Sequence, residues 1–491
     1  MNTEHPTRKS LRIVVMGAGM AGILAALRLR EAGRHTVVVY EKADRIGGTW
    51  RENTYPGLAC DVPAHAYTYS FAPNAEWSSY LAPGPEIQRY FESIVQSHQL
   101  ESLIRFGEEI TRCEFVDGQW RIETARGTHD RADIVIAATG VLHHPSMPAI
   151  AGLDSFAGPH FHSARWDHSV PLDGRRIGVI GCGSTGVQIV SALAGRASNL
   201  VHIQRTPQWI MPTPNDPYTE EQKAAFRADP ALIDAVRYNE EYTSAVRRFT
   251  SAIIDKESPE IHEIEAVVLK NLEDSVRDPV LREKLRPDYR AACKRLIFSS
   301  DYYQKVQRPD VEVAIGPIAQ IEPAGVRMAD GAFHALDILV LATGFRADRF
   351  VRPMRVLGRN GADIDAAWTP APSAYLGITV PGFPNFFMLN GPTGPVGNFS
   401  LIDIAERQWG YIEQLIADLE SGKGRLVDLK AETMRDYDQR RIAAARGTIF
   451  GSGCKSWYLD ANGVPSSWPW SYDAFAEQTA RPRAGDYEYI H

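Results

Sequence analysis

Two stretches of the chain repeat one succession of hydrophobic and polar positions. In each, a short apolar run precedes a glycine-containing turn, an apolar pattern with helical spacing, and a β-branched run. The first stretch has apolar runs at 11–16 and 36–40, with a helix expected over 23–32 between them. The second stretch has such runs at 176–180 and 200–204. These patterns predict an α/β protein with two Rossmann-like strand–helix–strand units.

The region 215–290 shows a helical pattern instead. It is rich in Ala, Glu, Lys and Arg and almost free of glycine, so we expect a helical insertion within the second unit. Beyond the insertion the pattern returns to alternating elements. Strand-like runs are expected at 311–315 and 338–341, and amphipathic helices at 404–419 and 431–445.

The length and charge of the chain favour a protein of several domains that does not bind nucleic acid. A chain of 491 residues is too long for one simple core, so two or three domains are expected, with room to enclose a large cofactor. The formal net charge is -7, and no stretch is dense in Lys and Arg. Nucleic acid is therefore not an expected partner.

The cysteines and the first residues bear on location. The five cysteines are odd in number, widely spread and never arranged as Cys-x-x-Cys, which argues against a structural metal and suits the reducing cytoplasm. The first ten residues are polar, and the apolar stretch after them is interrupted by Gly17, Arg28 and Arg30. We expect no signal peptide and no membrane span.

The first glycine turn has the composition of a dinucleotide site. Gly17, Gly19 and Gly22 follow a strand and open a helix, so the backbone and the helix N-terminus can approach a pyrophosphate. Glu41 ends the next strand, at the distance where a carboxylate binds ribose hydroxyls. The alternative is a tight turn without a ligand. The complete context favours a dinucleotide.

The second turn carries Gly181, Gly183 and Gly186 in the same context, but no acid ends its second strand. Arg205 stands there instead, and a guanidinium can pair with a 2'-phosphate, which indicates NADP and not NAD. Alternatively, Arg205 is a solvated residue at a strand end. Two dinucleotide sites in one chain imply hydride transfer from a nicotinamide to a flavin.

A longer motif precedes the second turn. Phe156, Gly158, His162, Trp166 and Asp167 match the pattern F-x-G-x-x-x-H-x-x-x-W followed by Pro or Asp at every fixed position. This is the fingerprint of Baeyer–Villiger monooxygenases, which are class B flavoprotein monooxygenases. The chain resembles this family.

Further segments extend the resemblance over nearly the whole chain. They are the pattern at 47–61 and the short segments 293–295, 301–303 and 456–458. The segment 390–398 departs from the family form, so the resemblance does not specify which ketone is the substrate. The number of subunits is not indicated either.

The resemblance implies a reaction. NADPH reduces FAD, the reduced flavin adds O2 at C4a, and the peroxyflavin converts a ketone to an ester or lactone. Arg295 is implied as the catalytic cation, with Asp61 as its partner. Without the resemblance, Arg295 and Lys294 would be exposed charges and Asp61 a turn carboxylate. His162 and Trp166 are interpreted as structural or conformational residues.

The resemblance and the two glycine turns together imply further cofactor contacts. These are Thr49, Trp50, Asp61, Tyr67, Ser184, Thr185, Gln188, Thr206, Lys294 and Trp457. Among them, Trp457 is expected on a mobile lid over the bound NADP, which would keep water from the reacting centre.

The patterns divide the chain into five segments. We expect FAD-binding segments at 1–148 and 371–491, NADPH-binding segments at 149–214 and 291–370, and the insertion at 215–290. The last FAD-binding segment also carries the lid.

Other functions compete with ketone oxidation. A flavin monooxygenase acting on nitrogen or sulfur shares both nucleotide units, and so does an NADPH-dependent flavin reductase or oxidase. A disulfide reductase would need a redox-active cysteine pair, and Cys60 stands alone in the sequence. A nucleotide-binding sensor without chemistry would not oxidise NADPH.

Overall fold

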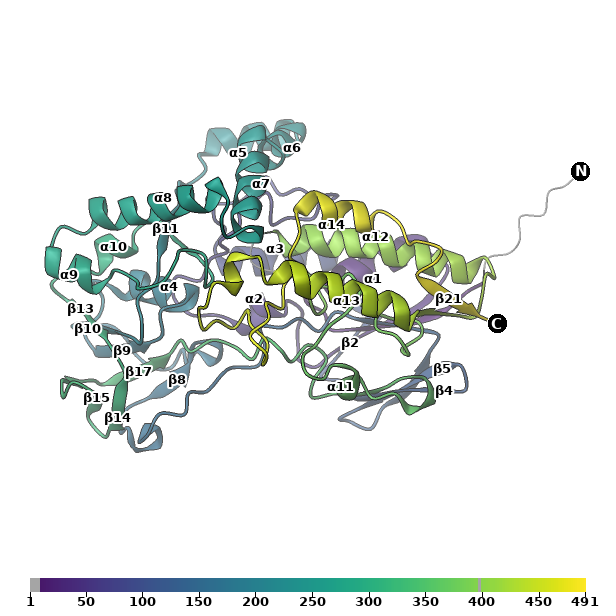
Figure 1. Cartoon of the computed structure of the whole chain (residues 1–491), viewed down its shortest axis with the longest axis horizontal. Helices are drawn as coiled ribbons and strands as arrows, with labels where there is room; N and C mark the ends of the chain where they lie inside the picture. Colours follow the sequence, from purple (N-terminus) through teal and green to yellow (C-terminus); the bar gives the residue numbers. More distant parts are fainter. Residues whose placement is uncertain (1–8, 396–398) are drawn as a thin grey trace, which may run out of the picture.

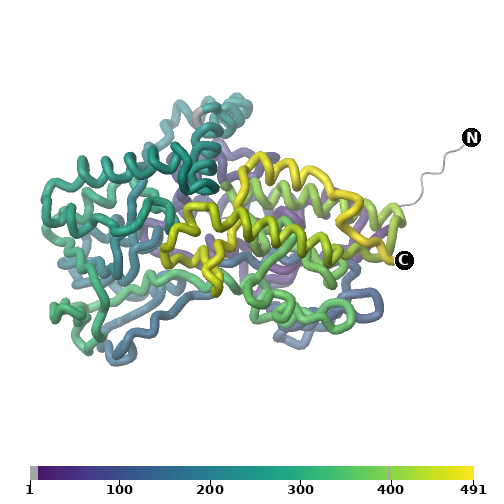
Figure 2. The backbone as a smooth tube through the Cα atoms, in the orientation of Figure 1, coloured from purple at the N-terminus to yellow at the C-terminus, as the bar shows by residue number. Residues whose placement is uncertain are grey.

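The structure is a computed structural model that describes residues 9–395 and 399–491 (Figure 1). Two α/β halves lie side by side, each built on a five-stranded parallel sheet. The chain passes from one half to the other and back, so its N-terminal and C-terminal parts share one half (Figure 2). The predicted fold class, with two Rossmann-like units, is confirmed.

The first sheet has the strand order β19-β7-β1-β2-β3, and all its neighbouring strands are parallel. The helix α1 (Met20–Ala32) connects β1 to β2 and begins inside the glycine turn, three residues before the sequence pattern indicated. The strands are β1 (Arg12–Met16), β2 (Thr36–Glu41), β3 (Ile104–Phe106), β7 (Ile134–Ala137) and β19 (Phe386–Met388).

The second sheet has the order β13-β10-β9-β17-β8, also entirely parallel. Its helix α4 (Ser184–Leu193) opens at the second glycine turn. The strands are β8 (His160–His162), β9 (Arg176–Ile180), β10 (Asn199–Gln204), β13 (Val311–Ile315) and β17 (Ile338–Leu341).

The insertion is helical, as predicted, and lies along the top of the molecule in Figure 1. Its longest helices, α7 and α8, pack on each other. The short strands β11 (Ile210–Pro212) and β12 (Ile297–Ser299) pair beneath α8 and join the insertion to the second half. The helices are α5 (Glu220–Ala228), α6 (Ala231–Arg237), α7 (Glu240–Ile254), α8 (Pro259–Ser275) and α9 (Pro279–Lys284).

The C-terminal part returns to the first half, where α12 (Leu401–Glu420) packs on α1. The helices α13 (Ala431–Ala445) and α14 (Tyr472–Thr479) flank α12 in Figure 1. The remaining helices are α2 (Thr49–Glu52), α3 (Gly84–Ser97), α10 (Tyr302–Lys305) and α11 (Ile364–Ala367).

Smaller sheets complete the two halves. A four-stranded sheet has the order β18-β4-β5-β6, a three-stranded one β14-β15-β16, and a two-stranded one pairs β20 with β21. Their strands are β4 (Ile110–Val116), β5 (Gln119–Thr124), β6 (His129–Ala132), β14 (Ile318–Glu322), β15 (Gly325–Met328), β16 (Phe333–Ala335), β18 (Arg355–Leu357), β20 (Leu426–Leu429) and β21 (Tyr487–Ile490).

Two crossing segments connect the halves and are hydrogen-bonded to each other. The backbone N–H of Ser146 donates to the carbonyl of Gly344 over 2.8 Å, and the Thr343 hydroxyl donates to the carbonyl of Ser146 over 2.7 Å. Each crossing follows an interior strand, β7 or β17, so each carries the chain from the carboxyl edge of a sheet. In open α/β folds ligands bind at this edge.

Neither a membrane span nor a metal cluster is found in the described part of the chain. No helix within 9–395 or 399–491 is both long and apolar enough to cross a bilayer. Over the same residues, no three His, Cys, Asp or Glu side chains are grouped to hold a metal ion.

Candidate active site

The glycine turn after β1 is too tight for side chains at two positions. Gly17 has φ +94°, and a Cβ there would lie 2.7 Å from the carbonyl oxygen of Ala138. A Cβ on Gly22 would lie 1.8 Å from the carbonyl oxygen of Gly17. Gly17 and Gly19 line the central cavity, whereas Gly22 closes the turn behind it. Gly22 thus shapes the site without facing it.

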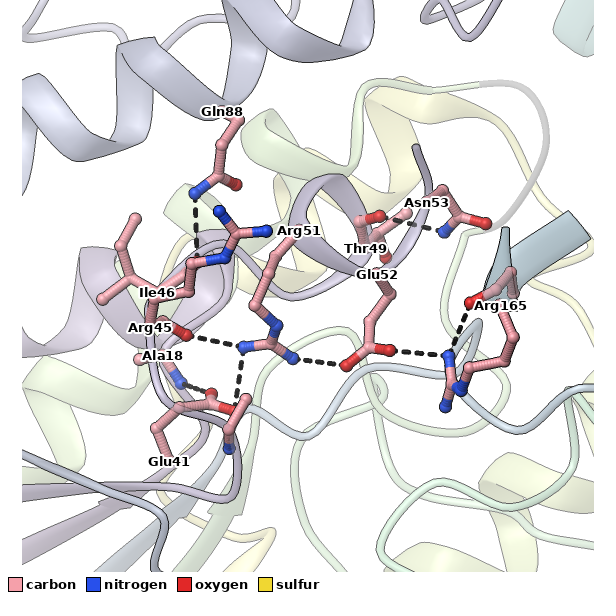
Figure 3. Close-up of polar contacts among 12 residues, drawn as sticks. Ala18, Glu41, Arg45, Ile46, Thr49, Arg51, Glu52, Asn53, Gln88 and Arg165 are labelled. Carbon is pink, nitrogen blue, oxygen red and sulfur yellow. Dashed lines mark hydrogen bonds and ion pairs between the residues drawn. The ribbon is translucent and has the colours of Figure 1, made fainter. Parts of the chain in front are cut away.

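Glu41, at the end of β2, is buried and heavily hydrogen-bonded (Figure 3). One carboxylate oxygen accepts the backbone N–H of Ala18 over 2.7 Å. The other accepts the backbone N–H of Ala43 and the guanidinium of Arg51, over 2.9 and 3.0 Å. A carboxylate offers about four acceptor positions. The geometry therefore leaves capacity for one ligand hydroxyl, and Glu41 lines the cavity.

Arg51 is the first of three charged side chains that are joined in a row, which no motif in the sequence indicates (Figure 3). It donates to Glu52 over 2.6 Å, and Glu52 also accepts from Arg165 over 2.7 Å. Burial raises the pKa of the Glu52 carboxyl, but the opposing effects of Arg51 and Arg165 outweigh it, so the pKa is lowered. Arg165 belongs to the fingerprint segment, which is thereby tied to the first nucleotide unit.

The second glycine turn repeats the geometry of the first. Gly181 has φ +114°, and a Cβ there would lie 2.2 Å from the carbonyl oxygen of Ala342. A Cβ on Gly186 would lie 2.0 Å from the carbonyl oxygen of Gly181, and Gly186 does not line the cavity. A Cβ on Gly183 would meet nothing within 4 Å, so the backbone there is open to a ligand.

The cations Arg205 and Lys294 and the hydroxyl of Thr206 lie together beyond β10. The Lys294 ammonium donates to the Thr206 hydroxyl over 3.2 Å and lies 3.8 Å from the centre of the Tyr289 ring. Burial, together with the charge of Arg205, lowers the pKa of Lys294. Neither cation forms an ion pair within the described residues. Such an arrangement is suited to a bound anion with several oxygens.

Tyr55 connects the first unit to α4. Its hydroxyl donates to the side-chain oxygen of Gln188 over 2.9 Å and lies 3.3 Å from the Thr185 hydroxyl. The Gln188 amide donates to the carbonyl of Ala59 over 3.0 Å. Because both ends of the Gln188 amide have protein partners, Gln188 holds the two units together, and its assignment as a cofactor contact stays a prediction.

Arg295 and Asp61 are brought together from positions 234 residues apart. A guanidinium nitrogen of Arg295 donates to a carboxylate oxygen of Asp61 over 2.5 Å. Arg295 lies two residues before β12, whereas Asp61 follows the Pro-Gly turn of the first unit. The charge of Asp61 raises the pKa of Arg295 above its usual value, so the arginine stays cationic.

Aromatic residues border the same space. The Trp50 indole donates to the Tyr67 hydroxyl over 3.2 Å, and their rings meet edge to face at 5.6 Å. Trp457, on the loop after α13, has an exposed fraction of 47% and stacks on Tyr458 with ring centres 4.1 Å apart. An exposed indole on an aromatic support offers a flat surface to a ligand.

The two units, the insertion and the C-terminal loop enclose one cavity of about 1970 Å³. Three residues that line it have a buried side-chain oxygen without a hydrogen-bond partner among the described residues: Ser184 Oγ, Asn390 Oδ1 and Ser400 Oγ. Ser400 stands at the N-terminus of the 20-residue helix α12, whose first N–H groups have no partner within the helix. Buried polar atoms are normally satisfied, so these positions fit polar ligands at both nucleotide sites.

His162 and Trp166 have structural partners. One ring nitrogen of His162 lies 3.0 Å from the carbonyl of Gly344, and the other accepts the backbone N–H of Ala164. Burial lowers the pKa of His162, so the ring is neutral at pH 7. Trp166 packs edge to face on Phe161 in the core. Both side chains thus have partners within the protein, and their interpretation as structural or conformational residues stays a prediction.

A disulfide joins Cys293 to Cys454, with Cα atoms 6.0 Å apart. The interpretation that the cysteines suit a reducing cytoplasm missed this pair. The two cysteines are 161 residues apart, so their spacing in the sequence gives no sign of a bond. Cys293 directly precedes Lys294 and Arg295, and Cys454 lies three residues before Trp457. The bond therefore ties the C-terminal loop to the segment that carries both cations.

Known proteins are similar to this chain in sequence. The family described as pyridine nucleotide-disulphide oxidoreductase matches residues 14–223. A Baeyer-Villiger monooxygenase of Streptomyces coelicolor is 36% identical over 100% of this chain and 95% of its own length. The chain belongs to the Baeyer–Villiger monooxygenases. An uncharacterized monooxygenase of Mycobacterium tuberculosis is 45% identical over 94% of this chain and 92% of its own.

Solved structures of monooxygenases are also similar to this structure. Cyclohexanone monooxygenase from Rhodococcus sp. Phi1, bound to NADP+, is 31% identical with a TM-score of 0.86, covering 98% of this chain and 99% of its own. A steroid monooxygenase bound to NADP is 30% identical with a TM-score of 0.87, covering 98% and 100%. This Baeyer–Villiger monooxygenase is thus an NADPH-dependent flavoenzyme whose cofactors are FAD and NADP(H).

Replacing Glu41 with glutamine is expected to weaken FAD binding about 10- to 100-fold, the scale of a lost hydrogen bond to a charged group. The amide keeps the size of the side chain but loses the charge that pairs with Arg51. FAD content after dialysis and quenching of FAD fluorescence on binding measure the effect. The matched control is Glu31→Gln, which changes an exposed carboxylate on α1. Equal FAD affinity in both variants would contradict the assignment of Glu41.

Replacing Cys454 with serine is expected to loosen the C-terminal loop, because the loop loses its covalent link to Cys293. The free energy of unfolding should fall by about 2–4 kcal/mol, because the unfolded chain without the cross-link has more conformational entropy. Thermal unfolding and amide hydrogen exchange over 452–467 measure the change. A reductant should reproduce both effects in the parent protein and leave the variant unaffected. A parent protein that is insensitive to reductant would argue against the disulfide.

Proposed function

We propose that this enzyme inserts one oxygen atom of O2 beside the carbonyl of a ketone, giving an ester or lactone. One observation carries the proposal: the Arg295–Asp61 pair lies in the cavity that both nucleotide sites share. A fixed cation stabilises negative charge as it develops on a carbonyl oxygen, most strongly where bound cofactors and substrate exclude water. Relatives named for cyclohexanone and steroid oxidation support a ketone as substrate.

Each proposed residue has a limited task. Arg205, Thr206 and Lys294 bind the 2'-phosphate of NADPH and so select this coenzyme. Gly19 and Gly183 line the cavity, and their lack of side chains lets the two pyrophosphates approach the N-termini of α1 and α4. When bound, FAD supplies the redox chemistry, which is hydride acceptance and activation of O2.

The remaining residues control charge and water. Arg295 holds a positive charge beside the substrate oxygen, and Asp61 orients the guanidinium without taking its proton. Trp457 and its loop cover the coenzyme and keep water out, which prevents loss of reducing equivalents as hydrogen peroxide. We place the enzyme in the cytoplasm.

A substrate panel tests this proposal. Purified enzyme with FAD and NADPH is offered cyclic, linear, aryl and steroid ketones, together with thioethers and tertiary amines. The proposal expects ester or lactone from at least one ketone class, with one NADPH consumed per product. Sulfoxide or N-oxide without any ester would instead support oxidation at sulfur or nitrogen. NADPH consumption with hydrogen peroxide as the sole product would support an oxidase.

A further inference from the structure

Tyr458 is a second partner of Arg295. It lies on the loop after α13, directly after Trp457, and only 2% of its surface is exposed. Its ring packs in one hydrophobic cluster with Cys293 and Leu296, which stand on either side of Arg295 in the sequence. Burial raises the pKa of the Tyr458 hydroxyl, and the nearby Arg295 guanidinium opposes that rise. Tyr458, Arg295 and Asp61 all line the same cavity. The guanidinium therefore has one anchor in the first nucleotide unit and another in the C-terminal loop.

The Tyr458 ring is itself held firmly. Its centre lies 4.2 Å from that of Phe450 and 4.1 Å from that of Trp457. The backbone carbonyl of Tyr458 accepts both the N–H and the hydroxyl of Ser466, over 2.8 and 3.0 Å. Tyr458 also belongs to the hydrophobic cluster that contains Cys293 and residues of α7 and α8. Its hydroxyl is thus a fixed point against which a flexible side chain can be aligned.

Arginine needs such alignment because its long side chain has many rotamers and its planar group binds in defined directions. Asp61 holds one guanidinium nitrogen, which leaves rotation about that contact. A second contact on the same group restricts this freedom. The disulfide of Cys293 and Cys454 keeps the two segments that supply Arg295 and Tyr458 in register.

We propose that Tyr458 is a positioning residue, which fixes the Arg295 guanidinium toward the cavity when the C-terminal loop is seated. This inference rests on the proposed role of Arg295 as the cation of the reaction. The phenol does not touch the reacting atoms in this account. It acts through the arginine, so one loop both covers the coenzyme through Trp457 and aligns the cation through Tyr458.

Tyr458→Phe tests the proposal, since it removes the hydroxyl and keeps the ring contacts. The matched control is Tyr411→Phe, a buried tyrosine outside the cavity whose hydroxyl donates to Tyr487 over 3.1 Å. In Tyr458→Phe, product per NADPH is expected to fall about tenfold, the scale of one hydrogen bond to a charged group, with hydrogen peroxide rising to match. The KM for NADPH and the rate of flavin reduction should stay at parent values, because the loop still seats. Tyr411→Phe should behave as the parent.

A measurement without turnover completes the test. Amide hydrogen exchange over 294–299 in the enzyme with NADP+ should be faster in Tyr458→Phe than in Tyr411→Phe, while exchange over 462–467 is unchanged. Equal coupling and equal exchange in the two variants would overturn the proposal. A raised KM for NADPH with faster exchange throughout the loop would also overturn it, because Tyr458 would then only hold the loop. If the parent oxidises no ketone, the proposed function fails, and exchange over 294–299 alone decides for or against the Tyr458 contact.

Discussion

Arg295→Ala is expected to reduce ester or lactone formation by about 10²–10³-fold, the loss typical when a preorganised charge-stabilising donor is removed. The benefit of the cation appears only as negative charge develops on the substrate, so binding of FAD should survive. Product analysis, FAD content and hydrogen peroxide per NADPH measure the three effects. NADPH should still be consumed, with its reducing equivalents released as hydrogen peroxide.

The control for Arg295→Ala is Arg290→Ala. Arg290 lies five residues earlier and is ion-paired with Glu265 over 2.7 Å, outside the cavity. This variant should retain the parent ratio of product to NADPH. Asp61→Ala should act less severely than Arg295→Ala, because the arginine remains charged and loses only a partner that orients it. Parent-level product from Arg295→Ala would show that another group supplies the positive charge.

Arg205→Ala is expected to weaken NADPH binding by about 1.5–3 kcal/mol and to leave NADH nearly unchanged. Arg205 and Lys294 lie together, and neither forms an ion pair with a carboxylate among the described residues, so a 2'-phosphate would pair with both. KM values for both coenzymes, and dissociation constants for NADP+ and NAD+, measure the change.

The matched control for Arg205→Ala is Arg196→Ala, which removes an exposed arginine of the same unit that pairs with Asp173. It should leave the preference for NADPH intact. Equal losses for NADPH and NADH in Arg205→Ala would indicate a structural role, since NADH has no 2'-phosphate to lose. Lys294 alone would then account for coenzyme selection.

Regular elements of this fold were predictable because each carries its own periodic pattern. The apolar runs at 176–180 and 338–341 coincide with β9 and β17, and the pattern at 431–445 coincides with α13. The pattern at 404–419 missed the first turn of α12, which begins at Leu401. The periodicity of apolar residues indicates which face of an element is buried. It defines the ends of a helix less well, because capping contacts determine where a helix begins and ends.

Contacts between distant segments were predictable only where both residues belong to recognised family motifs. The pairing of Asp61 with Arg295 followed from resemblance, and the structure places the two side chains together. Arg51 and Arg165 occupy variable positions of recognised motifs, so nothing in their spacing indicated a shared partner in Glu52. The roles of these residues remain predictions, as do the five segment boundaries.

Other features had no sequence signal at all. The Cys293–Cys454 bond and the Tyr458–Arg295 contact both depend on how the C-terminal loop folds over the second unit. That placement arises from hydrophobic packing around Tyr458, α7 and α8, which one sequence does not encode as a motif. Part of the unusual segment 390–398, Val396, Gly397 and Asn398, lies outside the described residues.

Oxidation under ¹⁸O2 tests the central claim most directly. The parent enzyme is incubated with NADPH, a ketone that it accepts and labelled oxygen, and the ester or lactone is analysed by mass spectrometry. One ¹⁸O atom is expected per product molecule, located in the inserted ester oxygen, with the carbonyl oxygen unlabelled. Unlabelled ester, or label recovered only as hydrogen peroxide and water, would contradict oxygen insertion by this enzyme.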